Sequence, residues 1–442
     1  MKISLHIKET VKLALPISIG QLGHIMMGVV DSLMVGKLGP ASLAAASLVN
    51  GIFFLIMVLG LGMTMAITPL VAIADGADKP DDVKSIFNNG FIVNLIYAFM
   101  LSGITFAVTY LLPFLNQPKD VTYLATSYLR IQVISIAPFM VFQIARQYLD
   151  GLSLVKPSMY IAVFVNFIHI FLNWVFIYGK LGVPQLGLDG AGIATTGSRF
   201  FMAGAIFVYL YKFNKNKHLA PSISFIKYDV KIIKKIIEIG IPSGFQYFME
   251  VAAFTFSAVM IGWFGSVSLA AHQIALNLAS LTYMVILGIS SAGTIRVGNC
   301  LGAGELKDVR RAGFSAIGLA GSIMLGSSLI LISANKILPS FYISDPGVIE
   351  LASKLIIIAA LFQLADGIQA TSVGVLRGLT DVKIPLAIIF SSYWLIAIPI
   401  SFWLGVHLNW GAVGIWTGLS IGLFLVAILC VFRFYIKTRG HK

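Results

Sequence analysis

Long apolar stretches recur along nearly the whole chain, and they limit its fold more than any other feature. A helix needs ~20 mostly apolar residues to cross ~30 Å of hydrocarbon, and hydropathy indicates twelve such segments. Only 11% of the residues are charged and 58% are hydrophobic, whereas soluble proteins average about 25% charged residues. We therefore expect an all-α integral membrane protein. The predicted spans are residues 11–36, 46–74, 87–112, 124–148, 157–178, 190–212, 238–263, 269–298, 312–333, 351–375, 385–405 and 411–433.

The distribution of Lys and Arg predicts how the spans are oriented. With the N-terminus inside, most of the 31 Lys and Arg residues fall in inner segments. This asymmetry predicts a multi-pass protein of the inner (plasma) membrane with both termini in the cytoplasm. It also explains the net charge of +13 without nucleic acid as a partner. The N-terminal stretch lacks the features of a cleaved signal peptide. Outer segments hold Lys37, Lys119, Arg130, Lys180, Lys336 and Lys354, and Arg199 falls within a span.

An internal repeat divides the chain into two halves. At an offset of 226 residues the matches form an ordered series, which includes Pro16 with Pro242, Gly36 with Gly262, Gly39 with Gly265, Ser42–Ala45 with Ser268–Ala271, and Gly62 with Gly288. Each half has an even number of spans, so the repeats are parallel. We expect two pseudo-symmetric six-helix bundles facing a central cavity. The predicted divisions are an N-terminal lobe at 1–212, a cytoplasmic linker at 213–237 and a C-terminal lobe at 238–442.

Three acidic residues lie within predicted spans: Asp31, Glu250 and Asp366. A charge at the centre of a spanning helix costs about 2.5–3.5 kcal/mol on insertion scales, so the default interpretation is functional. A structural hydrogen bond remains the alternative for Glu250 and Asp366, and an interfacial anchor or an ion pair with Lys37 is the alternative for Asp31. Polar residues share one helical face with Glu250, which predicts a water-filled cavity; they are Ser243, Gln246, Tyr247 and Ser257.

Other spans carry polar residues at helical spacing. Such residues also serve only to join helices, and His24, His169 and His272 have the alternative of being satisfied core histidines. The chain lacks a P-loop and an HExxH motif, and its two cysteines show no metal-ligand spacing. Any transport is thus expected to be secondary, with no cofactor, and an enzyme is not expected. The polar sets are Gln21, His24 and Asp31; His169 and Asn173; His272, Gln273, Asn277 and Ser280; and Gln363, Asp366 and Gln369.

Several stretches resemble the multidrug and toxic-compound extrusion (MATE) transporters, particularly the NorM-type bacterial branch. They include LPISIGQLGHIMMGVVDSLMVGKLG around Asp31, IGIPSGFQYFMEVAAFTFSAVMIGWFG around Glu250, and LFQLADGIQATSVGVLRGLTDVKIP around Asp366. SLAAHQIALNLASLTYMVILGISSAGTIRVGNCLGAG and FLNWVFIYGKLG also fit, so the resemblance covers essentially the whole chain. It implies twelve helices in two lobes and export of organic cations, driven by inward Na⁺ or H⁺.

The resemblance also assigns roles to residues at matching positions. Glu250 and Asp366 resemble the cation-coupling carboxylates of the C-terminal lobe and are candidate Na⁺ ligands. Asp31 resembles the acidic residue of the N-terminal lobe, with Asn173 and Thr195 beside it. Two positions depart from the family. His169 stands where relatives often have Asn, which favours a response to protons because imidazole titrates near neutrality. Phe362 stands where NorM-type relatives often have Tyr, which removes an oxygen ligand.

The resulting hypothesis is antiport by alternating access, in which small-molecule drugs are attracted to the same negative charge as the coupling ion and compete with it directly or through conformation. The chain is expected to act as a monomer in the lipid bilayer. A flippase of lipid-linked precursors from the same superfamily is an alternative, although it would be expected to have a more cationic cavity and extra spans. An intramembrane enzyme is a further alternative. The residues predicted to line the substrate cavity are Gln21, His24, Gln246, Tyr247, Gln273, Asn277, Gln363 and Gln369.

Overall fold

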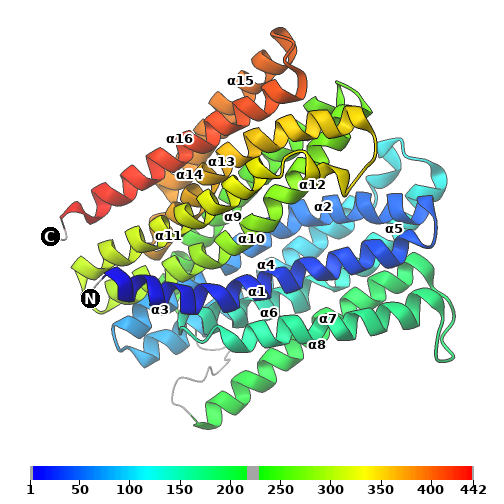
Figure 1. The fold of residues 1–442 in the computed structure, drawn as a ribbon. Helices are drawn as coiled ribbons and strands as arrows, with labels where there is room; N and C mark the ends of the chain where they lie inside the picture. The colour runs from blue at the N-terminus through cyan, green and yellow to red at the C-terminus, as the bar shows by residue number, and fades with distance from the viewer. Residues whose placement is uncertain (1–2, 217–227, 441–442) are drawn as a thin grey trace. The chain divides into compact units, whose positions relative to one another are not determined.

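Helices make up almost all of the computed structural model, which describes residues 3–216 and 228–440 (Figure 1). No β-strand occurs in these two ranges, which confirms the all-α class. Residues 217–227 of the predicted linker lie outside the described residues. The helices are α1 (Ile3–Gly36), α2 (Pro40–Thr64), α3 (Ile67–Gly76), α4 (Pro80–Val108), η1 (Leu112–Leu115), α5 (Lys119–Ile134), α6 (Ile136–Gly151), α7 (Lys156–Tyr178), α8 (Gly187–Asn216), α9 (Val230–Gly262), α10 (Ser266–Gly302), α11 (Leu306–Ser333), α12 (Ile337–Ser340), α13 (Pro346–Gly378), α14 (Lys383–Phe390), the π-helix η2 (Ser391–Ala397), α15 (Ile398–Phe402), the π-helix η3 (Trp403–His407) and α16 (Gly411–Arg439).

Twelve membrane spans are present when one bent helix pair is counted as a single span. Eleven segments of the described chain are long and apolar enough to span by themselves, and α5 with α6 supplies the twelfth across a bend of 42°.

The predicted span 385–405 is interrupted by the two π-helices η2 and η3. Pro399 lies between them. Because proline has no backbone N–H, it removes one hydrogen bond from the regular helical ladder.

The contacts divide the chain into two compact units. Unit 2 comprises residues Ile19–Gly244, and unit 1 comprises Met1–Ser18 together with Phe245–Lys442. Both boundaries fall inside a helix, just after Pro16 in α1 and just after Pro242 in α9. The predicted lobes 1–212 and 238–442 assign each of these helices whole to one lobe. In the structure the first half of each helix packs with the other half of the chain.

Repeated glycines provide the physical reason for this exchange. A Cβ atom on Gly62 of α2 would lie 2.0 Å from the Cα of Gly244 in α9. A Cβ on Gly288 of α10 would lie 2.0 Å from Ser18 Oγ and 2.6 Å from the Ala14 carbonyl oxygen in α1. Small residues allow helix backbones to approach closely in a membrane. Gly62 and Gly288 are matched in the repeat, so both halves use the same close contact, each with the first half of the other long helix.

The repeat also preserves a turn. Gly39 and Gly265 precede α2 and α10 with φ angles of 117° and 96°. These angles lie in the region that favours glycine. The carbonyl oxygens of Gly39 and Gly265 accept a hydrogen bond from the N–H of Leu43 and Leu269 respectively, both at 3.2 Å. The two halves therefore start their second span with the same geometry.

Gly62→Ala is expected to destabilise unit 2, because the added methyl group would overlap the backbone of α9. Overpacking of this kind costs about 1–3 kcal/mol. The measurement is the thermal unfolding temperature of the purified protein in detergent. Gly51→Ala on the same helix is the matched control, since a Cβ there meets nothing within 4 Å. Equal melting temperatures for the two variants would contradict the close contact.

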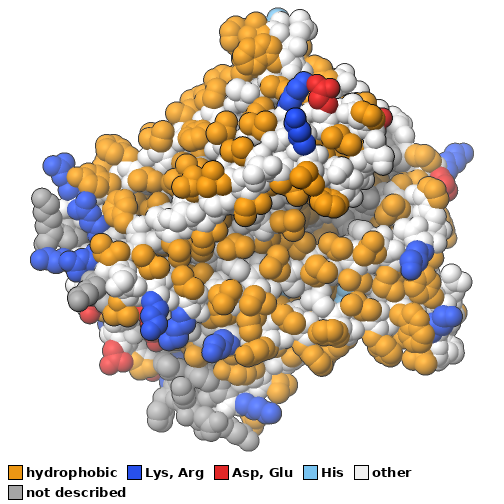
Figure 2. All heavy atoms as spheres, in the orientation of Figure 1, with side chains coloured by type: hydrophobic (Ala, Val, Ile, Leu, Met, Phe, Trp, Pro, Cys, Tyr) orange, Lys and Arg blue, Asp and Glu red, His pale blue; other side chains and the backbone are white. Residues whose placement is uncertain are grey.

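The surface fits a hydrocarbon environment. Large apolar side chains are exposed on α4 and α7, including Phe99 and Phe167 at 63% and 66% exposure. Figure 2 shows hydrophobic side chains over most of the visible face, with Lys and Arg mainly toward helix ends. Together with the spans, this surface makes the chain a multi-pass membrane protein.

Candidate functional site

Asp31 of α1 is the centre of a buried polar cluster in unit 2. Its Oδ1 atom lies 2.8 Å from His169 Nε2 and accepts a hydrogen bond from Asn173 Nδ2 at 2.7 Å. Its Oδ2 atom accepts a hydrogen bond from the Thr195 hydroxyl at 3.2 Å. His169 and Asn173 lie one turn apart on α7, and Thr195 is on α8, which runs beside α7 (Figure 1). All four residues are at most 7% exposed. This burial argues against the interfacial-anchor alternative for Asp31.

The His169 ring can hold a proton in more than one place. Its Nδ1 atom lies 3.1 Å from Ser198 Oγ, and that hydroxyl is also 2.8 Å from the Ala194 carbonyl oxygen. When Nδ1 lacks a proton, Ser198 can donate to it. When Nδ1 carries a proton, the Ser198 hydroxyl can accept a hydrogen bond from Nδ1 and donate its own hydrogen to the Ala194 carbonyl oxygen. The Ser198 hydroxyl therefore suits His169 with or without a proton on Nδ1. In the contact between His169 Nε2 and Asp31 Oδ1, the shared proton can lie on the nitrogen or on the oxygen.

The cluster also offers oxygen atoms to a cation. Asn173 Oδ1 is buried and has no hydrogen-bond partner within residues 3–216 and 228–440. An unpaired buried acceptor is costly, and amide and carboxylate oxygens are ligands for hard cations. Asn173 Oδ1, the two Asp31 oxygens and the Thr195 hydroxyl are thus a donor set that fits Na⁺.

Two other predicted residues of α1, Gln21 and His24, face α6. The Gln21 Oε1 atom accepts a long hydrogen bond of 3.4 Å from Arg146, which lies 3.6 Å from Asp150 in an ion pair. His24 packs edge-on against Phe139 and Phe142, and its Nε2 atom is buried without a hydrogen-bond partner in the described part of the chain. The buried Arg146–Asp150 pair was not predicted from the sequence, because both residues lie near the end of their span.

A second group of polar residues surrounds Glu250 and Asp366 in unit 1. Asp366 of α13 is 8% exposed and lies close enough to Glu250 of α9 for their charges to interact. The Gln369 side chain lies near Glu250 and accepts a hydrogen bond from the Tyr393 hydroxyl at 2.9 Å. Tyr283 of α10 interacts electrostatically with both carboxylates. Two carboxylates thus share one polar group contributed by α9, α10, α13 and η2.

The tyrosines of this group were not found from the sequence. Phe362, which stands where relatives often have Tyr, packs its ring 5.4 Å from the Trp416 ring. The hydroxyl groups near the carboxylates come instead from Tyr283 and Tyr393. Tyr393 lies in the π-helix η2, and π-helical segments often occur at functional positions. That irregularity is not visible in the hydropathy pattern.

The remaining predicted residues of unit 1 make different contacts. Gln246 is buried and donates to the Val382 carbonyl oxygen at 2.7 Å. Gln363 is fully buried and links Thr282 to Ser327. Gln363 therefore joins helices through both ends of its amide, whereas Gln246 Oε1 is buried with no hydrogen-bond partner among the described residues. Tyr247 interacts with Arg377. Gln273 and Asn277 are exposed and form a hydrogen bond with each other at 3.1 Å.

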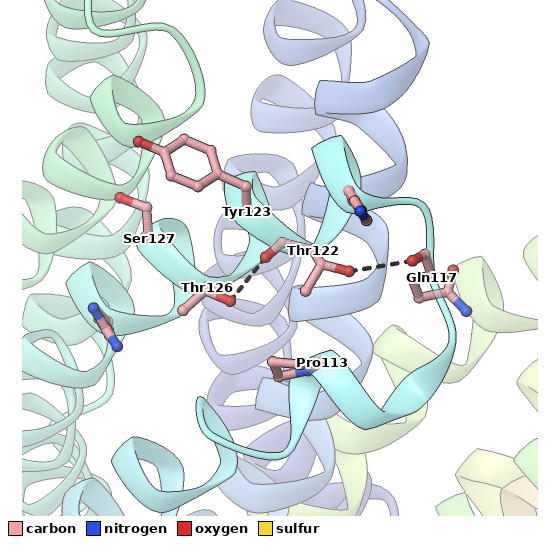
Figure 3. A pocket seen from close by; sticks show the side chains of 8 residues that line it. Pro113, Gln117, Thr122, Tyr123, Thr126 and Ser127 are labelled. Carbon is pink, nitrogen blue, oxygen red and sulfur yellow. Dashed lines mark hydrogen bonds between the residues drawn. The ribbon is translucent and has the colours of Figure 1, made fainter.

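His272 and a surface pocket lie apart from both groups. Trp416 Nε1 donates to His272 Nδ1 at 3.0 Å, while His272 Nε2 is buried and has no hydrogen-bond partner among the described residues, so the core-histidine alternative is met at one ring nitrogen only. The pocket, of about 630 Å³, lies at the start of α5 and is lined by no predicted site residue. Figure 3 shows two of its hydroxyl groups engaged locally: Thr126 donates to the Thr122 carbonyl oxygen, and Thr122 donates to the Gln117 carbonyl oxygen. The lining residues are Pro113, Gln117, Lys119, Thr122, Tyr123, Thr126, Ser127 and Arg130.

Up to twelve spans in the described residues, with buried ionisable groups in both units, define a polytopic membrane protein of the kind that carries ions or substrates. The MatE family model matches residues 16–175 and 242–403, so the chain belongs to the MATE family. The Multidrug resistance protein NorM of Burkholderia vietnamiensis is 33% identical over 442 residues, covering 99% of this chain and 95% of that protein. The NorM protein of Vibrio vulnificus is 31% identical, covering 98% and 95%.

Solved structures show the same fold. The bent form of the Vibrio cholerae MATE transporter VcmN has a TM-score of 0.89 at 19% identity, covering 99% of this chain and 98% of that chain. The eukaryotic MATE transporter AtDTX14 has a TM-score of 0.89 at 20% identity, covering 99% and 98%. At this identity the likeness concerns the fold alone. The sequence-based family resemblance is confirmed by the family model and the NorM relatives.

Proposed function

We propose that this chain exports small organic compounds by cation antiport through alternating access. In this proposal it works as a monomer in the inner membrane, with both termini in the cytoplasm and no resident cofactor. The observation that carries the proposal is the Asp31 cluster: a buried carboxylate that contacts His169, Asn173 and Thr195 within a membrane span. The names of the relatives, multidrug resistance proteins, support drug-like substrates and argue for a transporter over an enzyme.

The chemistry of the cluster supports competition between a cation and a proton. A Na⁺ ion would be held by the Asp31, Asn173 and Thr195 oxygens. A proton on Asp31 would remove the negative charge that attracts Na⁺ or a cationic drug. Each charge that enters across a potential of ~100 mV contributes about 2.3 kcal/mol. Binding of the coupling ion and release of a cationic substrate are therefore linked through one carboxylate.

The Glu250–Asp366 group supports a second cation-coupling position. Two nearby carboxylates repel each other unless a proton or a cation lies with them. Gln369 lies near Glu250, and the Tyr283 and Tyr393 side chains lie within electrostatic range of the two carboxylates. We propose that this group binds Na⁺ or H⁺ from outside the cell and releases it into the cytoplasm.

Efflux under one imposed gradient at a time tests the proposal. The purified protein is reconstituted in liposomes with a fluorescent cationic dye, and a Na⁺ gradient or a pH gradient is applied alone. At least one of the two ion gradients is expected to drive the dye against the dye's own concentration gradient. The gradient that does so identifies the coupling ion. Liposomes without protein are the control. Dye movement that is the same with both gradients dissipated would reject ion coupling.

A further inference from the structure

Arg199 is an arginine within the spanning part of α8, and its surroundings in unit 2 are unusual. Its guanidinium carbon lies 5.0 Å from the centre of the Phe53 ring and 4.9 Å from that of the Phe139 ring. Its Nη1 atom donates to the Ser135 hydroxyl. Two aromatic rings and one hydrogen bond thus hold the guanidinium in a fixed position, and the side chain remains partly exposed.

The contacts within the protein leave part of the guanidinium unused. Among the described residues, no carboxylate lies within ion-pair distance of Arg199, and only Ser135 accepts a hydrogen bond from it. Asp31 interacts with it electrostatically, but from beyond ion-pair distance. A cation inside the membrane is expensive and usually faces a water-filled space. Its Nε and Nη2 atoms are therefore available to a ligand.

We propose that Arg199 binds an anionic group, a carboxylate, of the transported compound. The inference rests on the efflux function proposed above and adds a specificity-determining residue to it. A planar guanidinium can bind a carboxylate through two parallel hydrogen bonds. Phe139, which also contacts His24, gives a flat ring system an apolar surface. Thr195, one turn before Arg199 on α8, bonds Asp31. Unit 2 therefore presents the Arg199 cation on α8 within electrostatic range of the Asp31 anion on α1, which suits an aromatic compound that carries a carboxylate.

A matched pair of dyes separates carboxylate binding from general binding. The probes are a rhodamine with a free carboxylate and its methyl ester, which differ only in that group. Equilibrium binding to the detergent-solubilised protein is followed by fluorescence anisotropy, and efflux is measured in proteoliposomes. In Arg199→Gln, affinity for the free acid is expected to fall roughly ten- to hundredfold, as for loss of hydrogen bonds between charged groups. Affinity for the ester is expected to stay within about twofold, since it makes no such bonds.

Two further variants make the result specific. Arg130→Gln is the matched control, because Arg130 also lies over an aromatic ring of unit 2, that of Tyr110, at 6.0 Å. It is expected to leave both affinities unchanged. Arg199→Lys keeps the charge but loses the planar fork, so it should retain part of the preference for the acid.

Equal losses for acid and ester in Arg199→Gln would overturn the proposal and assign Arg199 a structural role or a role toward Asp31. No change in either affinity would overturn it as well. If the dyes bind with the expected preference but no gradient drives their efflux, the antiport proposal fails while the Arg199 assignment stands.

Discussion

Asp31→Asn is expected to abolish ion-driven efflux while the protein still folds. Asparagine keeps the shape of the side chain but removes the negative charge that a cation or a proton would neutralise. It also replaces the charged partner of the buried His169 ring, 2.8 Å away, with a neutral one. Loss of hydrogen bonds to a charged group costs about 1.5–3 kcal/mol, so affinity for the coupling ion should fall at least tenfold. The measurement is dye efflux from proteoliposomes under the gradient that drives the wild type.

Asp189→Asn is the control for this substitution. Asp189 is also on α8 in unit 2, but its carboxylate accepts a hydrogen bond from Ser127, away from the Asp31 cluster. This variant is expected to transport like the wild type. Full coupled efflux by Asp31→Asn would reject the cluster as a coupling site. Unfolding of Asp31→Asn in detergent would instead point to a structural role for the charge.

Glu250→Gln and Asp366→Asn are each expected to reduce coupled efflux by at least tenfold, a loss of about 1.4 kcal/mol or more. Since the two carboxylates interact, they should act as one unit. The double variant is then expected to lose little more than either single variant, because coupled residues are not additive. Each single change also removes a like charge from the pair, so the melting temperature should stay level or rise. Transport and stability therefore move in different directions.

Glu350→Gln is the matched control on α13. Glu350 is exposed and pairs with Lys354 at 2.8 Å, and surface pairs of this kind contribute little. Losses that add fully in the double variant would argue for two independent sites. Unchanged efflux in both single variants would remove unit 1 from the coupling mechanism.

Much of the fold follows from the sequence because the bilayer imposes a length and a composition on every span. Glu250 and Asp366 were recognised because a charge within an apolar spanning helix is costly in the hydrocarbon of the bilayer. The repeat of Gly62 and Gly288 was visible as a pattern. The sequence did not show which helix each of these glycines contacts, because a repeat identifies equivalent positions and carries no information about contacts.

The composition of the two polar groups was only partly predictable. Asp31, His169 and Asn173 stood out as polar residues on otherwise apolar faces. Their meeting with Thr195 came from the family resemblance, and the role of Ser198 required the structure. The aromatic partners of Arg199 come from α2 and α6 and carry no mark in an apolar chain, where aromatic residues are ordinary. Tyr393 depends on a π-helical segment that hydropathy cannot reveal.

The division of α1 and α9 between the compact units has a consequence for synthesis of the protein. Ala14 leaves the ribosome long before Gly288, its close neighbour in the finished chain. At about 5–20 residues per second, the start of α1 waits roughly a quarter of a minute to a minute for that neighbour. Unit 2 in turn needs Gly244, so its shortest complete version ends well inside α9. If the gene were divided near residue 216, the N-terminal product would lack the first half of α9 that unit 2 needs. The C-terminal product would lack the first half of α1 that unit 1 needs.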